Sequence, residues 1–216
     1  MNDCGKRRNA IRNGDYVNEI EPSMKNVISD TKKSRGRPAR LDKAQAVTIA
    51  EQLFHQDGYD QLGVSTICDA LGVGQPALYR LFGNKAGLFE AVLERYLTTP
   101  HATFISEQVE RSETPDELAR NILLSAAEIY TNDPIRRGCL AMETTYGSAD
   151  KAAQLTANHL VEQTRSMLAQ QFKTLGAKDA DARANAILVV LRGLSSEARI
   201  GRSKESLQDA VSVLIA

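Results

Sequence analysis

Apolar side chains recur along the chain with the spacing of helices. The first run obeys the i, i+3, i+4 rule and consists of Ala46, Ile49, Ala50, Leu53 and Phe54. Asp42 precedes this run as an N-cap, with Gln45 three residues later, and Asp57-Gly58 follows it with a glycine suited to a left-handed C-terminal position. We therefore expect a helix over about residues 43–57.

Three further apolar groups follow at short intervals. Val64 to Leu71 supports two helical turns before Gly72-Val73-Gly74, and a short helix begins at Gln75-Pro76, where proline suits the first helical position. Gly83-Asn84 interrupts the pattern, and Lys85 to Leu97 resumes it. Two short helices joined by a glycine turn and flanked by longer helices predict a helix-turn-helix.

Beyond residue 98 the pattern predicts longer helices. Thr114-Pro115-Asp116-Glu117 is a capping box that opens a helix ended by Asp133-Pro134. A shorter piece is expected around 138–142, followed by helices over about 149–175 and 179–200 and a last one from about 205. No segment alternates with period two long enough to require a strand. The predicted fold class is all-α, with an N-terminal helix-turn-helix domain and a C-terminal helical bundle.

An apolar stripe marks the helix expected over 179–200. It consists of Ala184, Ile187, Leu188, Leu191 and Leu194. Two interpretations are open: burial within the bundle of the same chain, or a dimer interface between two copies. Small residues such as Ala180 and Ala198 permit close helix approach in either case.

The net charge of zero conceals an uneven distribution. Lys and Arg total 27, as do Asp and Glu, yet residues 1–41 hold ten basic and five acidic side chains, a net charge of +5. Such an arm is either a solvated, disordered terminus or an electrostatic footprint for nucleic acid. Met24 is an alternative translational start. We expect a basic disordered arm over 1–34, a helix-turn-helix domain over 35–97 and a second domain over 98–216.

Several classes of protein and site are disfavoured. No run approaches the ~20 apolar residues of a membrane span, and the N-terminus lacks the apolar stretch of a signal peptide, so we expect a cytoplasmic protein without membrane contact. Three widely spaced cysteines predict neither a disulfide framework nor a thiolate metal site, and the histidines lack metal-ligand spacing. No catalytic constellation appears, so we expect no enzyme, no metal and no cofactor.

The segment Gly72-Val73-Gly74-Gln75-Pro76-Ala77-Leu78-Tyr79-Arg80-Leu81-Phe82-Gly83-Asn84-Lys85-Ala86-Gly87-Leu88-Phe89 resembles the recognition region of the TetR family of bacterial transcriptional regulators. The resemblance extends over about residues 35–96. It implies that the protein binds DNA. Two departures stand out: Leu81 replaces an aromatic or histidine that often precedes Phe82, and Leu62-Gly63 replaces the usual Thr or Ser.

The first turn of a recognition helix places side chains at base edges in the major groove. We expect Gln75, Pro76 and Ala77 to contact bases, because a glutamine amide can pair with adenine and the other two offer apolar surface to a thymine methyl. For these three residues alone, a solvent-facing helix start is the alternative. Phosphate contacts are expected from a separate set, which consists of Tyr79, Arg80 and Lys85, with Ser65 and Thr66 as weaker candidates.

Arg35-Gly36-Arg37-Pro38 has the pattern of a minor-groove arm. Glycine permits close approach to the groove floor, and the two arginines suit the negative potential of a narrow A·T minor groove. An ordinary basic lead-in to the first helix is the alternative interpretation.

The resemblance further implies a homodimer that binds an operator in double-stranded DNA and is released by a small-molecule effector. Candidate pocket residues are Phe104, Tyr130, Cys139, Met142 and Tyr146, which could equally be plain core. Cys139 follows Arg136 and Arg137, so it is either a sensor thiol with a lowered pKa or a buried, inert cysteine. The competing functions are an architectural DNA-binding protein without an effector and a helical-bundle enzyme.

Overall fold

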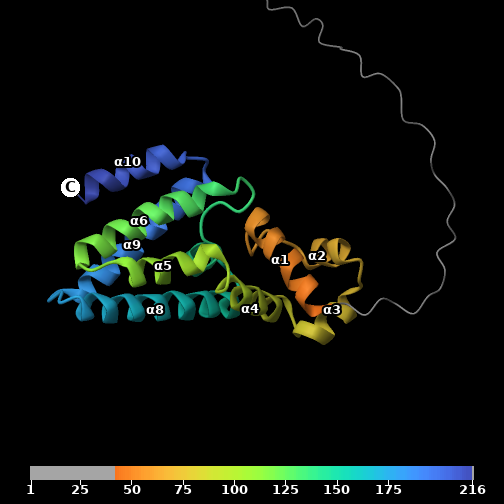
Figure 1. Cartoon of the computed structure of the whole chain (residues 1–216). Coiled ribbons are helices and arrows are strands. Elements are labelled where there is room, and N and C mark those ends of the chain that lie inside the picture. The colour runs from red at the N-terminus through yellow and green to blue at the C-terminus, as the bar shows by residue number, and fades with distance from the viewer. Residues whose placement is uncertain (1–41, 216) are drawn as a thin grey trace, which may run out of the picture. The chain divides into compact units, whose positions relative to one another are not determined.

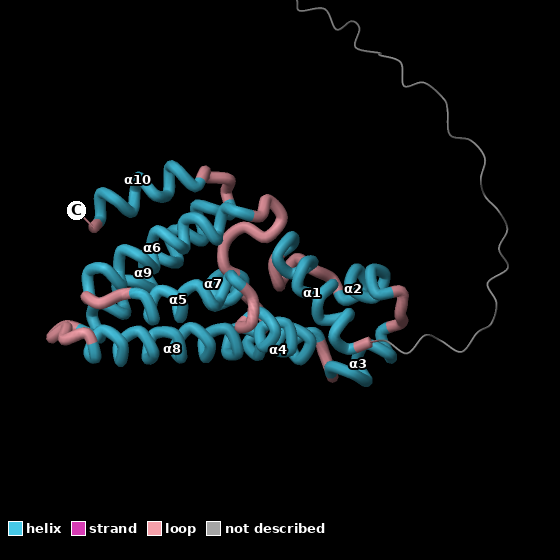
Figure 2. Tube along the Cα trace, in the orientation of Figure 1, coloured by secondary structure: helices cyan, strands magenta, loops and turns pink. Residues whose placement is uncertain are grey.

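The computed structural model describes residues 42–215, and every regular element within them is a helix (Figures 1 and 2). The helices are α1 (Lys43–Asp57), α2 (Val64–Leu71), α3 (Gln75–Phe82), α4 (Lys85–Tyr96), α5 (Pro100–Arg111), α6 (Pro115–Asn132), α7 (Leu140–Gly147), α8 (Lys151–Thr174), α9 (Ala180–Arg199) and α10 (Lys204–Leu214). We call α1–α4 the head and α5–α10 the bundle. The all-α prediction is confirmed.

Helix starts coincide with the predicted caps because the capping side chains satisfy backbone N–H groups that lack helical partners. The Asp42 carboxylate accepts a hydrogen bond from the Ala44 N–H at 3.0 Å, and the Asn84 side chain accepts one from Gly87 at 2.8 Å. Thr114 accepts from the Glu117 N–H at 3.2 Å, as its capping box predicts.

Helix α5 was not predicted from the sequence. Phe104 and Ile105 are its only buried residues, so the apolar repeat is too sparse to predict a helix. The helix is positioned instead by its packing against α6, where the Phe104 and Tyr130 rings meet edge to face with centroids 6.0 Å apart. Tertiary packing here decides what the local pattern leaves undecided.

The head is built around an aromatic core. Phe54 of α1 meets Phe89 of α4 edge to face with centroids 5.2 Å apart, and Tyr59 lies against Phe89 at 4.8 Å. The turn between α2 and α3 requires φ +64° at Gly72, a left-handed conformation that glycine adopts without steric cost. Leu78 and Phe82 point into this core, which fixes the outward face of α3.

Helix α4 leads from the head into the bundle (Figure 1). In the bundle, α9 packs against both α6 and α8, and α10 covers α6. The apolar stripe Ala184, Ile187, Leu188, Leu191 and Leu194 is buried in this core. The structure therefore favours burial within the same chain over a dimer interface for these five side chains, because a buried face is not available to a second copy.

None of the helices between residues 42 and 215 is long and apolar enough to cross a membrane.

Candidate nucleic-acid interface and ligand cavity

The first turn of α3 carries the predicted base-reading residues on the surface of the head. Gln75 and Pro76 are exposed and Ala77 is half-buried, while Leu78 of the next position is fully buried. Burial of one face of α3 thus determines which face is presented to a ligand. An exposed glutamine amide at the start of a two-turn helix has the reach and the paired donor and acceptor to read a base edge.

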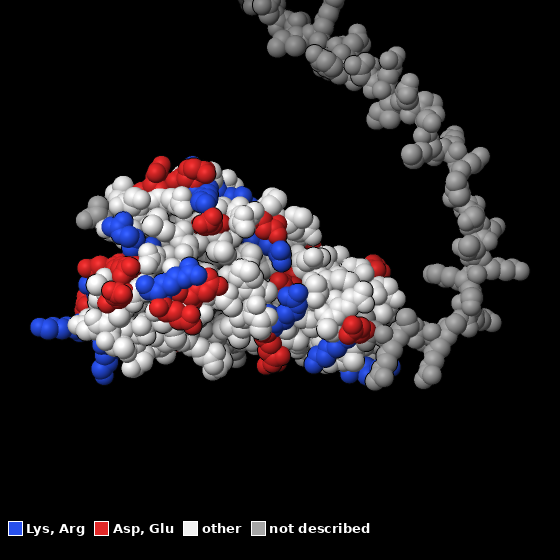
Figure 3. Space-filling model, viewed as in Figure 1, with Lys and Arg blue, Asp and Glu red and all other residues white. Residues whose placement is uncertain are grey.

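Cationic and hydroxyl-bearing side chains surround this turn. Tyr79 and Arg80 are exposed on α3, as are Ser65 and Thr66 on α2. Lys43, which the sequence reasoning missed, lies with its ammonium 5.9 Å from the centre of the Phe82 ring, so the first turn of α1 approaches α3. The position of Lys43 right after the Asp42 N-cap did not predict this contact, because Phe82 is distant in the sequence and meets Lys43 only in the folded protein. Figure 3 shows blue side chains near the end of the head that holds α3.

Lys85 has a structural role as well as a predicted phosphate contact. Its ammonium donates a hydrogen bond to the Tyr59 carbonyl oxygen and lies 4.3 Å from the centre of the Tyr59 ring. Burial lowers the pKa of Lys85, while the carboxylates of Asp60 and Asp150 oppose this shift. An ammonium group has three donors, so one contact with a carbonyl leaves capacity for a phosphate.

The two departures from the family pattern have visible structural counterparts. Gly63 is the N-cap of α2 and makes no side-chain capping bond, and Leu62 before it is buried. Leu81 is exposed on α3 beside Arg80 and offers no hydrogen-bonding group. Beyond the first turn of α3, the polar groups that this helix itself offers to phosphate are therefore those of Tyr79 and Arg80.

The junction of α3 and α4 requires a glycine at position 87. A Cβ placed there would lie 2.1 Å from the Phe82 carbonyl oxygen, a backbone atom that cannot move without shifting α3. The close approach of Gly87 to the end of α3 fixes the position of α3, and with it of the first turn that carries Gln75, relative to α4.

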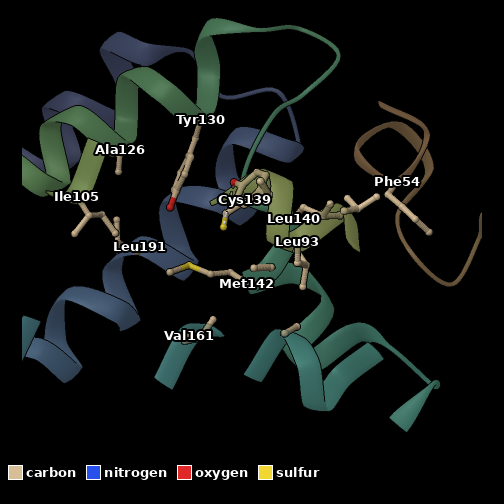
Figure 4. Close-up of a cluster of buried hydrophobic side chains, with 14 of the residues drawn as sticks. Phe54, Leu93, Ile105, Ala126, Tyr130, Cys139, Leu140, Met142, Val161 and Leu191 are labelled. Carbon is tan, nitrogen blue, oxygen red and sulfur yellow. Dashed lines mark hydrogen bonds between the residues drawn. The ribbon is translucent and has the colours of Figure 1, made fainter. Parts of the chain in front are cut away.

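A cavity of about 230 Å³ lies in the bundle beside the end of α4. Its lining residues include Tyr96, Phe104, Tyr130, Cys139, Met142 and Val161, and none of its lining residues is Asp, Glu, Lys or Arg. Figure 4 shows Tyr130 and Cys139 pointing toward Met142, with Val161 beyond it. Four of the five predicted pocket residues thus meet in one cavity. Tyr146 lies elsewhere, in a separate cleft between α7, α9 and the loop after α1.

Cys139 is buried and its thiol is not activated. Burial raises the pKa of Cys139, and the Tyr96 hydroxyl donates a hydrogen bond to its sulfur at 3.5 Å. The neighbouring cations point away: Arg136 binds Asp133 at 2.7 Å, and Arg137 donates to the Ala198 carbonyl at 2.5 Å. The structure therefore supports the inert alternative over the sensor with a lowered pKa.

The loop between α1 and α2 is bonded to the turn between α7 and α8, and we call this set of contacts the seat. The Tyr59 hydroxyl donates to the Asp150 carboxylate at 2.5 Å. The Asp60 carboxylate accepts from the Ser148 hydroxyl and from the Ala149 N–H, both at 3.1 Å. Hydrogen bonds to the charged form of Asp150, the one from Tyr59 foremost, lower its pKa. The seat joins the head to the bundle independently of α4.

A buried carboxylate forms a second link within this junction. Glu51 of α1 is 3% exposed, and its carboxylate lies 2.8 Å from Arg95 of α4 and 3.9 Å from Arg136 in the loop after α6. Burial raises the pKa of Glu51, and the two guanidinium groups oppose that shift. Nearby, the buried His55 ring has a pKa lowered to about 3, mainly by desolvation, and lies 5.7 Å from the His101 ring.

Other predicted features receive no structural test. Arg35, Gly36, Arg37 and the arm over 1–34 lie outside the described residues. Among residues 42–215, no group of three or more His, Cys, Asp or Glu side chains is arranged to hold a metal ion.

The geometry of the head agrees with comparisons to known proteins. The family described as "Bacterial regulatory proteins, tetR family" matches residues 47–92, which span α1 to α4. Over 172 residues the chain is 33% identical to the HTH-type transcriptional repressor BdcR of Escherichia coli (strain K12), covering 80% of this chain and 86% of the relative. The chain belongs to the TetR family. The resemblance predicted from residues 72–89 is confirmed.

Two further proteins extend the comparison. The HTH-type transcriptional repressor ComR of E. coli (strain K12) is 31% identical over 185 residues, covering 82% of this chain and 88% of the relative. The structure of a cysteine mutant of the TetR-family regulator CifR, complexed with 26-bp double-strand operator DNA, matches with a TM-score of 0.74 and 23% identity, covering 83% and 98% of the two chains. That likeness concerns the fold. Membership in the TetR family makes this chain a transcriptional regulator and not an enzyme.

Proposed function

We propose that the protein is a dimeric repressor that binds a palindromic operator and is released from it by a small molecule held in the cavity. The observation that carries the proposal is the α3 turn, where Gln75 and Pro76 are exposed while Leu78 and Phe82 anchor the helix. BdcR and ComR, both named repressors, support the direction of regulation. Because a repressor of this kind acts on DNA, the proposal includes a cytoplasmic location for the protein.

Two heads must reach successive major grooves, about 34–36 Å apart, to bind a palindrome. The exposed face of α9 supports the dimer that this requires. That face carries small and apolar side chains at helical spacing, namely Ala182, Ala186, Val189 and Gly193. Small residues let a helix of a second copy approach closely, and we assign this face to the interface in place of the buried stripe.

Helix α4 offers a physical route from the cavity to the operator. Its last residue, Tyr96, lines the cavity, and its first, Lys85, contacts the head loop at Tyr59. A helix of its length spans about 18 Å. A ligand that fits the cavity only when α4 has shifted favours another head spacing and so weakens operator binding, because binding to one state shifts the population. The boundary between head and bundle near residue 97 is part of this proposal.

The decisive experiment is selection of bound duplexes from random DNA, repeated with candidate small molecules present. A repressor recovers a palindrome and prefers it to scrambled duplex by about 10³-fold or more. The alternative, an architectural DNA-binding protein without an effector, predicts weak sequence preference and no release. Recovery of no common sequence contradicts the repressor proposal.

Phosphate contacts can be separated by the salt dependence of operator binding. We expect Arg80→Ala and Lys85→Ala each to lower the slope of log affinity against log salt by about one unit per protomer, because each removes one phosphate contact. Lys85→Ala is also expected to lower thermal stability, since Lys85 holds the Tyr59 carbonyl, whereas Arg80→Ala is not. An unchanged slope in either variant removes that residue from the phosphate set.

The interface on α9 is tested by a charge placed at its centre. Val189→Asp is expected to convert the dimer to monomer and to reduce operator affinity at least 100-fold, because two buried carboxylates would face each other across the symmetry axis. Val213→Asp on α10 is the matched control, since Val213 is 80% exposed and Val189 65%. Sedimentation equilibrium measures the state, and a Val189→Asp variant that remains dimeric contradicts the assignment.

A further inference from the structure

A second hollow, distinct from the cavity, lies where the head meets the bundle. This cleft has a volume of about 290 Å³ and is lined by the α1–α2 loop together with α7 and the end of α9. Its lining residues are Gly58, Tyr59, Asp60, Gln61, Leu140, Glu143, Thr144, Tyr146, Ser148, Ser196, Arg199 and Ile200. The cavity and the cleft share no lining residue, so they are separate sites.

The walls of the cleft are held in place by hydrogen bonds. On one side, the seat fixes Tyr59 and Asp60 to the turn before α8. On the other, Arg199 donates from Nη1 to the His55 carbonyl at the end of α1 and from Nε to the Glu143 carboxylate at 3.1 Å. The separation between head and bundle is therefore set by the fold at both sides of the cleft.

The cleft has an excess of negative charge. Three of its lining side chains are acidic or basic: Asp60, Glu143 and Arg199. Arg199 is paired with Glu143, and Lys85, just behind the lining, lies near both Asp60 and Asp150. The three carboxylates and two cations together leave one negative charge unbalanced. Asp60 accepts hydrogen bonds from neutral groups only, the Ser148 hydroxyl and the Ala149 N–H. A single positive charge in the cleft would make its lining neutral.

The remaining surface of the cleft is apolar. Tyr146 is 62% exposed and Ile200 71% exposed, large fractions for an aromatic and a branched aliphatic side chain. Leu140 adds to the same wall. The face of a tyrosine ring attracts cations, and the ring of Tyr146 also offers area for an apolar group.

We propose that the cleft binds a small organic monocation, with its ammonium group facing Asp60 and Glu143 and its apolar part against Tyr146 and Ile200. A dry cavity of 150 Å³ holds benzene, so a volume about twice as large suits roughly ten non-hydrogen atoms. Burial raises the pKa of Glu143 to about 7, so a bound cation would favour its carboxylate form and release a proton at neutral pH.

Binding in this cleft would also be coupled to DNA. The ligand would touch the α1–α2 loop of the head and α7 and α9 of the bundle at once, so it can stabilise one head position over others. This second step rests on the proposed function, whereas the binding step does not.

The binding step is tested by calorimetry on the full DNA-free chain with three matched probes. Phenethylamine carries the cation, 2-phenylethanol is its neutral counterpart and 3-phenylpropanoate its anionic one. We expect phenethylamine to bind at least tenfold more tightly than either, with a proton released at pH 7. Equal or tighter binding of the neutral or anionic probe overturns the proposal, as does no binding of phenethylamine.

Variants locate the bound probe. Glu143→Gln and Ser196→Phe are expected to weaken phenethylamine binding at least tenfold, the first by removing a charge and the second by filling the cleft. Glu162→Gln, an exposed acid on α8, is the matched control and should leave binding unchanged. Circular dichroism melting verifies that each variant is folded. Unchanged binding in both cleft variants places the probe elsewhere and overturns the assignment.

Operator binding is measured separately, first without any probe. Loss of sequence-specific binding in that arm contradicts the proposed function and leaves the cleft result standing. If the operator binds but phenethylamine changes its affinity less than twofold at saturation, the coupling is wrong.

Discussion

Replacing Gln75 by alanine is expected to abolish discrimination at one base pair in each half-site while leaving most of the affinity for random DNA. A bidentate amide contact to a base provides about 1–3 kcal/mol of discrimination, and a symmetric dimer makes it twice, so roughly 2–6 kcal/mol of specificity should disappear. Gln75 is exposed at the first turn of α3, and its side chain makes no hydrogen bond to any residue between 42 and 215. The measurement is a titration of the operator and of duplexes changed singly at each position.

The matched control is Gln56→Ala, an exposed glutamine on α1. It should leave the preference profile of the wild-type protein intact. If Gln75→Ala reduces affinity equally for every duplex, or leaves the profile unchanged, Gln75 does not read a base.

Replacing Arg95 by methionine is expected to lower the free energy of unfolding by about 2 kcal/mol at pH 7. The substitution leaves the buried Glu51 carboxylate with the more distant Arg136. Removing one partner of a fully buried ion pair costs about 3–5 kcal/mol, and the 39% exposure of the Arg95 side chain reduces that loss through solvent screening. Protonation of Glu51 limits the loss of stability, because a protonated Glu51 no longer needs a cationic partner. Taking up the proton costs about 1.4 kcal/mol for each pH unit above the unfolded-state pKa. Urea unfolding at several pH values measures it.

The pH dependence separates a charge effect from lost packing. In the variant the folded-state pKa of Glu51 lies further above its unfolded-state pKa. The folded protein is therefore destabilised at pH values above the unfolded-state pKa, and this destabilisation diminishes as the pH falls toward that pKa. The difference between variant and wild type should therefore narrow from pH 7 to pH 5. Adding Glu51→Gln should restore most of the lost stability. A difference independent of pH argues against an unpaired carboxylate.

Arg165→Met is a suitable comparison for Arg95→Met. Arg165 pairs with Glu162 at 2.8 Å on the surface, where solvent screening leaves an ion pair with little effect on stability. A loss from Arg165→Met as large as that from Arg95→Met would show that the effect arises from the methionine substitution itself rather than from burial of Glu51.

The helices of the head could be predicted from sequence because their signals are local. Asp42, Asn84 and the Gly72 turn act on backbone groups within a few residues, and α1 to α4 begin and end where these signals indicate. The exposed position of Gln75 followed as well, since Leu78 and Phe82 on the opposite side of α3 are apolar and buried.

The contacts between head and bundle could not be predicted in this way. The Tyr59–Asp150 and Asp60–Ser148 pairs join residues 91 and 88 positions apart, and no local pattern distinguishes these acids from solvated ones. The apolar stripe of α9 was ambiguous for a related reason, because periodicity shows that a face is covered without showing what covers it. Helix α5 was missed because its buried residues are too few to form a repeat.

Helix α7 connects the cavity with the seat, so the residues that bind a ligand and those that hold the head cannot change independently. Cys139 and Met142 at its start line the cavity. Just after its end, the Ser148 hydroxyl donates a hydrogen bond to the Asp60 carboxylate in the seat. The helix is only eight residues long and is packed against both α8 and α9, so it cannot bend to absorb a change at one end. A substitution at Met142 that admits a new ligand should therefore also alter how the head is held. Adaptation to a new inducer would then require compensating changes in the α1–α2 loop, and ligand specificity and operator affinity would evolve together.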